Sequence, residues 1–196
     1  DFKFESYMSA SKFFENYALK SNDGKSILES YEDKILIVSL ALANGDENFA
    51  KKIADKLIKQ EFQPATPTFL NAGRARAGEM VSCFLISVED SCEGISYAVA
   101  SANHLSKIGG GVALNLSRLR ASGESIKDIE GAAGGVVGVA KMLEQSFSYF
   151  NQMGARQGAG AVYLNVLHPD FELLMDTKKI NADEKIRLTN LSVGAI

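Results

Sequence analysis

Apolar residues recur at helical spacing through the first sixty or so residues of the chain. One amphipathic segment follows Asp46, which is a suitable helix N-cap. Its apolar positions are Phe49, Ala50, Ile53, Ala54, Leu57 and Ile58. A second set indicates an earlier helix and comprises Leu28, Tyr31, Ile35 and Leu40. The turn signal Asn44-Gly45 separates the two segments. The pattern predicts an all-helical domain over residues 1–64.

The pattern changes from Pro64 onward, where glycine becomes frequent and short apolar runs alternate with longer segments of helical period. The apolar runs cover residues 83–88, 112–116 and 161–166. This alternation is typical of βαβ units around a parallel sheet. With a fourth strand near Leu191, the strands are too few to close a barrel, so we expect an open or truncated sheet over residues 65–196. The fold class predicted for the chain is α/β.

Three helices are expected between or after these strands. Asp90 and Glu93 have the spacing of a capping box, so the first helix is predicted to begin at Asp90. The second is predicted from about Val136, and the third from Pro169 to Leu174, because proline is favoured in the first turn of a helix. The segment 63–82, with its prolines and hydroxyl side chains, is predicted to be a loop.

Composition narrows the class of protein. The chain has 196 residues, 46% of them hydrophobic, and a formal net charge of −3 with both signs interspersed. It has no basic stripe for a nucleic-acid backbone and no apolar run that would cross a membrane. Two cysteines, Cys83 and Cys92, with no metal-ligand spacing, fit a reducing cytoplasm. Because it begins without methionine and ends in an apolar run, we expect a piece of a longer protein.

Cys83 is the candidate for chemistry. Strand alternation places its side chain on the opposite face from Ser82 and Phe84. A single cysteine in an apolar strand is most simply a buried packing residue. A redox role would require a second thiol from outside the chain. Cys92 is interpreted as incidental and near the surface.

The glycine-bearing loops are the second candidate feature. Gly109 to Gly111 follow a helix and lead into a strand, the reverse of a phosphate loop, and a helix C-cap accounts for at least one of them. Arg120 opens a long polar loop, and Arg156 lies among glycines in another. Arginines on such loops suit phosphate or base recognition, although each is also an ordinary solvated side chain. Asp90 is a helix N-cap or a ribose ligand.

Several of these motifs, in their order and spacing, resemble one enzyme family. They read PATPTFLNAG, SCFL, SKIGGG, LRASG, NQMGARQGAG and YLNVLHPD. Together they resemble the large, catalytic subunit of aerobic ribonucleotide reductases, particularly class Ib, over nearly the whole chain. The resemblance implies an N-terminal helical domain followed by the first half of a ten-stranded α/β barrel.

The resemblance also implies a substrate site for a ribonucleoside diphosphate. Its residues would be Thr66, Ser82, Cys83, Gly111 and Arg156. Cys83 would be one of two thiols that reduce the ribose 2′ position and end as a disulfide, the other lying outside this chain. The family's radical-bearing cysteine has no counterpart here, so we expect the chain to be inactive by itself.

A second implied site binds an allosteric effector, a deoxynucleoside triphosphate or ATP. Asp90 and Arg120 would bind its ribose and phosphate, and Ser91, Ile126 and Lys127 would border it. A specificity loop would relay effector identity to the substrate base and comprises Gln152, Met153, Gly154, Ala155, Arg156, Gln157 and Gly158.

The implied partners follow from the same resemblance. A metal-containing small (beta) subunit would supply the radical, so this chain would bind no cofactor or metal of its own. A glutaredoxin- or thioredoxin-like protein would restore the thiols, and the large subunit would form a homodimer through the helices from Asp90 and Val136.

Two other functions remain open at this point. One is a non-catalytic domain for deoxynucleotide sensing or assembly, which would keep Asp90 and Arg120 and lack redox chemistry. The other is a glycyl-radical enzyme built on a related barrel. Fold by itself does not separate these functions, because barrels carry many chemistries.

Overall fold

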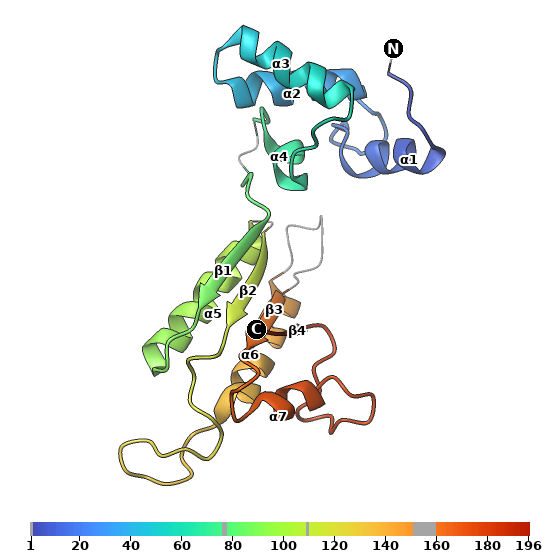
Figure 1. The fold of residues 1–196 in the computed structure, drawn as a ribbon. Helices are drawn as coiled ribbons and strands as arrows, with labels where there is room; N and C mark the ends of the chain where they lie inside the picture. Colours follow the sequence, from blue (N-terminus) through green and yellow to red (C-terminus); the bar gives the residue numbers. More distant parts are fainter. Residues whose placement is uncertain (1, 76–77, 109, 151–159) are drawn as a thin grey trace. The chain divides into compact units, whose positions relative to one another are not determined.

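The computed structural model describes residues 2–75, 78–108, 110–150 and 160–196. The chain divides into two compact units, Asp1–Ser82 and Cys83–Ile196 (Figure 1). The division lies later than the boundary expected between residues 64 and 65. The reason is that Phe69 and Ala72, which follow that boundary, belong to the hydrophobic core of the first unit.

The described part of the first unit contains four helices, α1 (Tyr7–Asn16), α2 (Tyr31–Ala43), α3 (Glu47–Ile58) and α4 (Thr66–Asn71). The helical prediction is therefore confirmed, and so is Asp46 as the N-cap of α3, since its side chain accepts a hydrogen bond from the Phe49 amide. Between α2 and α3, Asn44 has a left-handed conformation and Gly45 a φ of +93°, as the predicted turn requires.

The prediction of a loop over residues 63–82 is wrong for α4. Pro67 lies in the first turn of this helix, where the missing N–H costs nothing, and Phe69 is 3% exposed. A six-residue helix is too short for its period to stand out in the sequence. Burial of Phe69 among the aromatic side chains of the first unit supplies the stabilisation that local propensity does not.

The second unit is a four-stranded parallel sheet in the order β1-β2-β3-β4. The strands are β1 (Cys83–Ser87), β2 (Gly111–Asn115), β3 (Gly160–Leu164) and β4 (Ser192–Ala195). The helices are α5 (Cys92–Lys107), α6 (Gly135–Tyr149) and α7 (Phe171–Asp176). The four strands and the open sheet agree with the prediction, and the α/β class is confirmed.

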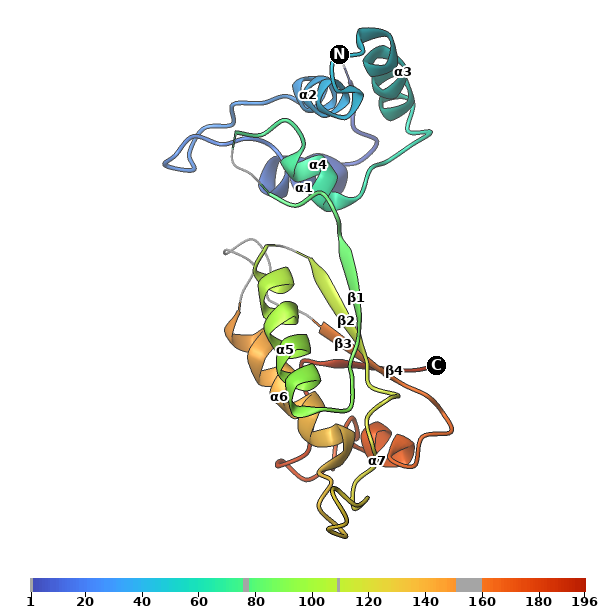
Figure 2. The same ribbon diagram turned by 90° about the vertical axis from the view of Figure 1, so that its left-hand side faces the viewer.

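Helices α5 and α6 lie side by side on one face of this sheet (Figure 2). The residues of the sheet that point toward them are buried, including Val112, Leu114, Val162 and Leu164. The opposite face carries Leu85, which is 84% exposed. Because β-strand side chains alternate between faces, the burial pattern of β1 also places Cys83 on this exposed face.

The beginnings of two helices differ from the predictions. Helix α5 begins at Cys92 with Ser91 as its N-cap, so Asp90 is not the cap and the Asp90–Glu93 capping box is wrong. Helix α7 begins at Phe171, two residues after Pro169. Helix α5 ends at the C-cap residue Ile108, and the Gly110 N–H donates to the Leu105 carbonyl oxygen at 3.1 Å, as at a closed helix end. Gly109, the next residue, lies outside the described residues, so the glycine C-cap stays a prediction.

Candidate functional site

Asp90 and Arg120 form an ion pair at the carboxyl end of the sheet. Asp90 lies after β1 and Arg120 after β2, and the ends of neighbouring parallel strands meet at one edge. The Arg120 Nε donates to the Asp90 Oδ2 at 2.6 Å, and the Arg120 backbone N–H donates to the Asp90 Oδ1 at 3.3 Å. Asp90 therefore uses both carboxylate oxygens to position Arg120, which explains why it does not cap α5.

The pair remains accessible to a ligand. The side chains of Arg120 and Asp90 are 34% and 30% exposed. The guanidinium also donates from Nη1 to the Ser125 carbonyl oxygen at 3.1 Å, which fixes its orientation. A planar cation held from one side in this way suits a phosphate group approaching from the other.

Ser91 lies next to this pair and has a structural role of its own. Its hydroxyl accepts a hydrogen bond from the Gly94 amide at 2.9 Å and so caps α5. The beginning of α5, where the helix dipole favours negative charge, is thus adjacent in sequence to Asp90. The structure therefore brings Asp90, Ser91 and Arg120 together.

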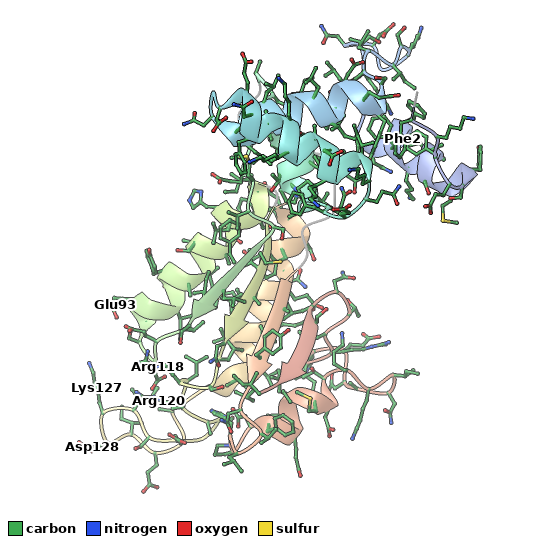
Figure 3. All side chains as sticks on the ribbon, turned by 45° about the horizontal axis from the view of Figure 1, so that its top comes forward. Phe2, Glu93, Arg118, Arg120, Lys127 and Asp128 are labelled. Atoms are coloured by element: carbon green, nitrogen blue, oxygen red, sulfur yellow. The ribbon has the colours of Figure 1, made fainter. Side chains whose placement is uncertain are left out.

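Ile126 and Lys127 lie on a hairpin that extends from this end of the sheet. Ile126 pairs with Ile129 through two backbone hydrogen bonds of 3.1 and 3.0 Å. The two residues between them, Lys127 and Asp128, both have positive φ, 48° and 65°, as a type I′ turn requires. Figure 3 shows Lys127 and Asp128 at the tip, farther from the sheet than Arg120. Lys127 is therefore an exposed cation beyond the ion pair.

Cys83 and Gly111 lie at the other end of the sheet. They are register partners at the first residues of β1 and β2. Cys83 is exposed and is not joined to Cys92 by a disulfide, so its interpretation as a buried packing residue is wrong for this chain. Cys92 is also exposed, as expected, at the first residue of α5. A thiol on the uncovered face is accessible to chemistry.

The remaining substrate candidates are distributed over both units and the segment outside the described residues. Thr66 and Ser82 belong to the first unit, whereas Cys83 and Gly111 belong to the second. Thr66 is the first residue of α4, and its hydroxyl lies 3.5 Å from the Tyr17 hydroxyl. The specificity loop, including Arg156, falls outside the described residues.

Sequence reasoning missed two polar residues near the hairpin, His168 and Asp170. Both follow β3, and the Asp170 carboxylate accepts hydrogen bonds from the Ser122 and Val136 amides. Their positions just after an apolar strand correspond to those of Asp90 after β1 and Arg120 after β2. A polar residue just after a third apolar strand could have indicated this position from the sequence, because such residues meet at the carboxyl edge of a parallel sheet.

Within residues 2–75, 78–108, 110–150 and 160–196, no group of three or more His, Cys, Asp or Glu side chains could hold a metal ion. Among the same residues, no helix has the length and apolar character needed to cross a membrane.

A helical domain followed by part of a parallel α/β barrel defines the class of protein. Residues 3–77 match the family model described as ribonucleotide reductase, all-alpha domain, and residues 81–196 match the one described as ribonucleotide reductase, barrel domain. The chain belongs to the large-subunit family of ribonucleotide reductases.

Individual relatives agree with this assignment. The chain is 58% identical over 195 residues to the ribonucleoside-diphosphate reductase subunit alpha of Bacillus subtilis (strain 168) and 53% identical to that of Mycoplasma genitalium. These alignments cover the whole chain and 28% and 27% of the two relatives. The Treponema pallidum protein of the same name is 31% identical over 189 residues, 94% of this chain and 22% of the relative. The chain thus spans roughly a quarter of the length of these relatives.

Proposed function

We propose that this chain is part of a ribonucleoside-diphosphate reductase alpha subunit, in which its parallel sheet carries a redox thiol at one end and a nucleotide effector site at the other. The observation that carries the proposal is this division of one sheet. Cys83 and Gly111 are partners where β1 and β2 begin, and Asp90 and Arg120 are paired beyond the ends of the same strands. Effector and substrate would therefore bind at separate ends of one rigid element.

The proposed redox role of Cys83 rests on the family resemblance and on the chemistry of the reaction. A radical supplied through a partner subunit removes the 3′ hydrogen of the ribose, and water leaves from C2′. Two thiols supply two electrons and two protons, one of which leaves with the C2′ hydroxyl as that water, and the thiols become a disulfide. The 3′ hydrogen is then returned to C3′, and an external dithiol protein reduces the disulfide by exchange. Gly111 beside Cys83 leaves room for a substrate at the backbone, because glycine has no Cβ.

The chain by itself should carry out no reduction. The reaction requires a radical-bearing cysteine in addition to the reducing pair, and the sequence contains only Cys83 and Cys92. Cys92 is on α5, whereas Cys83 is at the opposite end of β1, so these two do not form the pair. The second thiol and the radical cysteine would come from other parts of the full-length subunit.

The effector role uses the opposite end of the sheet. The Arg120 guanidinium would bind phosphate, the Asp90 carboxylate would accept from a ribose hydroxyl, and Lys127 would add charge from the hairpin. The effector would be a deoxynucleoside triphosphate or ATP. Residues 152–158 would transmit its identity to the substrate base, with Arg156 contacting the substrate.

A homodimer would form on the outer faces of α5 and α6. These helices carry large apolar side chains that point away from the sheet. Tyr97, Met142 and Tyr149 are 75%, 45% and 81% exposed. Exposed aromatic and methionine side chains grouped on neighbouring helices favour a protein interface.

The redox proposal is tested in the full-length subunit that carries this sequence, with its radical-generating partner and a dithiol reductant. Cys83→Ser is expected to reduce deoxynucleotide formation to background, because serine supplies no electrons. Cys92→Ser is the matched control and should leave turnover near the wild-type value. Full turnover by Cys83→Ser would show that the thiol has no catalytic role and would favour a domain that only senses nucleotides.

The effector proposal is tested by titrating the same subunit with dTTP and dATP. Arg120→Ala should weaken binding by roughly 10- to 100-fold, the range for loss of a charge-assisted hydrogen bond. Arg118→Ala is the control, since the Arg118 side chain is 64% exposed and pairs with Glu89 at 3.8 Å. Equal affinities for the two variants would place the effector elsewhere.

A further inference from the structure

The Asp170 carboxylate holds two distant backbone segments together. It is 5% exposed and lies between β3 and α7. Its oxygens accept from the Ser122 amide at 3.1 and 3.0 Å, and Oδ2 also accepts from the Val136 amide at 3.1 Å. Ser122 begins the hairpin that carries Ile126 and Lys127, and Val136 follows its end. One buried carboxylate thus fixes both ends of that hairpin.

His168 extends the same set of contacts. The Asp170 backbone N–H donates to the His168 Nδ1 at 3.1 Å, and the His168 Nε2 lies 2.7 Å from the Leu119 carbonyl oxygen. Because Nδ1 accepts here, the ring proton of the neutral imidazole is on Nε2, which donates to Leu119. His168 therefore fixes Asp170 on one side and the residue before Arg120 on the other.

Helix α6 depends on Asp170 for its first turn. Its N-cap residue is Gly134, which has no side chain to accept a hydrogen bond, and no side-chain cap is present in its own segment. The Asp170 carboxylate takes that role from a different part of the chain, where its charge is also favourable for the helix dipole. This capping joins the position of α6 to the position of the hairpin.

The backbone at Gly135 is adapted to this arrangement. Its φ is +68°, a conformation that favours glycine, and a Cβ there would overlap the Asp170 Oδ2 and lie 2.8 Å from the Ser122 backbone nitrogen. Glycine thus allows the start of α6 to approach both the carboxylate and the beginning of the hairpin. Three separate segments meet at Asp170.

We infer that Asp170 is a positioning residue for the proposed effector site, on whose function this inference rests. It contacts neither Asp90 nor Arg120 through its side chain; it fixes the backbone on both sides of residues 123–135. Without its carboxylate, the hairpin would populate other conformations. The apparent affinity for the effector would then fall in proportion to the fraction of molecules that keep the binding conformation.

The test uses the full-length subunit, with dTTP and dATP as probes, and compares the wild type with Asp170→Asn. The asparagine oxygen can take the place of Oδ2, which accepts from both amides, but its NH₂ group then replaces Oδ1 and faces the Ser122 N–H, a donor against a donor. The negative charge at the beginning of α6 is also lost. The effector concentration for half-maximal stimulation should rise by about tenfold or more. At saturating effector the stimulated rate should return to the wild-type value, which a general loss of folded protein would not allow. Amide exchange should accelerate at Ser122 and Val136.

Glu172→Gln is the matched control, because it removes an exposed carboxylate from the first turn of α7. It should leave the half-maximal concentration unchanged. If Asp170→Asn does not fold, His168→Asn replaces it: the Asn Oδ1 can accept from the Asp170 amide, but the donor to Leu119 is lost. This variant should raise the half-maximal concentration severalfold.

The outcomes separate this inference from the effector proposal. If Arg120→Ala loses effector binding while folded Asp170→Asn, or in its place His168→Asn, responds like the wild type, the positioning role of Asp170 is overturned and the effector site stands. If Arg120→Ala binds normally, the effector site itself is wrong. Loss of stimulation in Asp170→Asn that saturating effector does not restore would also overturn positioning, since it indicates a different defect.

Discussion

Replacement of Glu144 should loosen the turn that leads into β4. Glu144 lies on α6 and is 3% exposed, and its Oε1 accepts from the Thr189 amide at 2.6 Å and the Asn190 amide at 2.8 Å. Its Oε2 accepts from the Lys141 ammonium at 3.1 Å. Glu144→Ala leaves both amides without this acceptor, and each such loss costs roughly 1–3 kcal/mol. Thr189 and Asn190 are exposed, so their amides can bind water in the variant, which keeps the cost in the lower part of this range. We therefore expect a total loss of local stability of about 3 kcal/mol.

Glu144→Gln should be milder. The glutamine carbonyl oxygen can keep both backbone hydrogen bonds, whereas its NH₂ group faces the Lys141 ammonium, a donor against a donor. We expect a cost of about 1 kcal/mol. The expected order of stability is therefore wild type, Gln variant, Ala variant, with the largest step at the alanine.

Hydrogen exchange of the Thr189 and Asn190 amides in the full-length subunit measures this local free energy directly. The alanine variant should exchange about a hundredfold faster, since each 1.4 kcal/mol corresponds to about tenfold. Gln145→Ala, which truncates the exposed neighbour on the same helix, is the control and should change little. Wild-type exchange rates in Glu144→Ala would refute the role assigned to this carboxylate.

The same group predicts a dependence on pH. Burial raises the pKa of Glu144, but hydrogen bonds from the Asn190 amide, the Lys141 ammonium and the Thr189 amide outweigh burial, and the net pKa lies below its ordinary value. A carboxyl with a lowered pKa in the folded state stabilises above its unfolded pKa, and the contribution is lost as pH falls through the folded value. Protection of the turn should therefore decline only in acid, after correction for intrinsic exchange. Glu144→Gln, which does not ionise, should lack that decline.

Three further substitutions test the packing, one in the first unit and two in the second. Lys34 is buried 3.9 Å from the Glu29 carboxylate, and burial, opposed by Glu29 and reinforced by Arg74, lowers its pKa from 10.5 to about 8. Since the unfolded chain keeps this proton to higher pH, the stability of the fold should rise on the order of 1 kcal/mol or more above about pH 8. Thermal unfolding of Lys34→Met should show no such rise with pH, and a rise that persists in the variant would contradict the assignment. Gly160→Ala places a methyl group against the Phe147 ring and should destabilise by about 1–3 kcal/mol. Gly138→Ala, in open space on α6, should instead stabilise by about 0.5–1 kcal/mol, and equal unfolding temperatures for the two variants would refute the packing argument.

The strands were predictable because each is a short apolar run bounded by turn residues. All four begin within one residue of the predicted positions. Asp46 was also predictable as an N-cap, since the following helix has clear apolar periodicity and the cap bond spans only three residues. These features depend on local sequence, and the local sequence is sufficient for them.

The beginning of α5 was not predictable in the same way. Asp90 and Ser91 are adjacent and both are good N-caps, so local preference does not choose between them. The choice depends on Arg120, thirty residues later, which binds the Asp90 carboxylate and leaves Ser91 to cap the helix. The same ion pair is the centre of the proposed effector site.

The sequence by itself determined the helical domain, the alternating strands and helices, and the family to which the chain is related. Only the tertiary structure decided which residues of separate segments meet. It placed Cys83 beside Gly111, paired Asp90 with Arg120, and brought Asp170 to both ends of the hairpin. The physical reason is that a strand or cap is stabilised by neighbours in sequence, whereas a buried carboxylate takes hydrogen-bond donors from whichever segment the folded sheet brings near it.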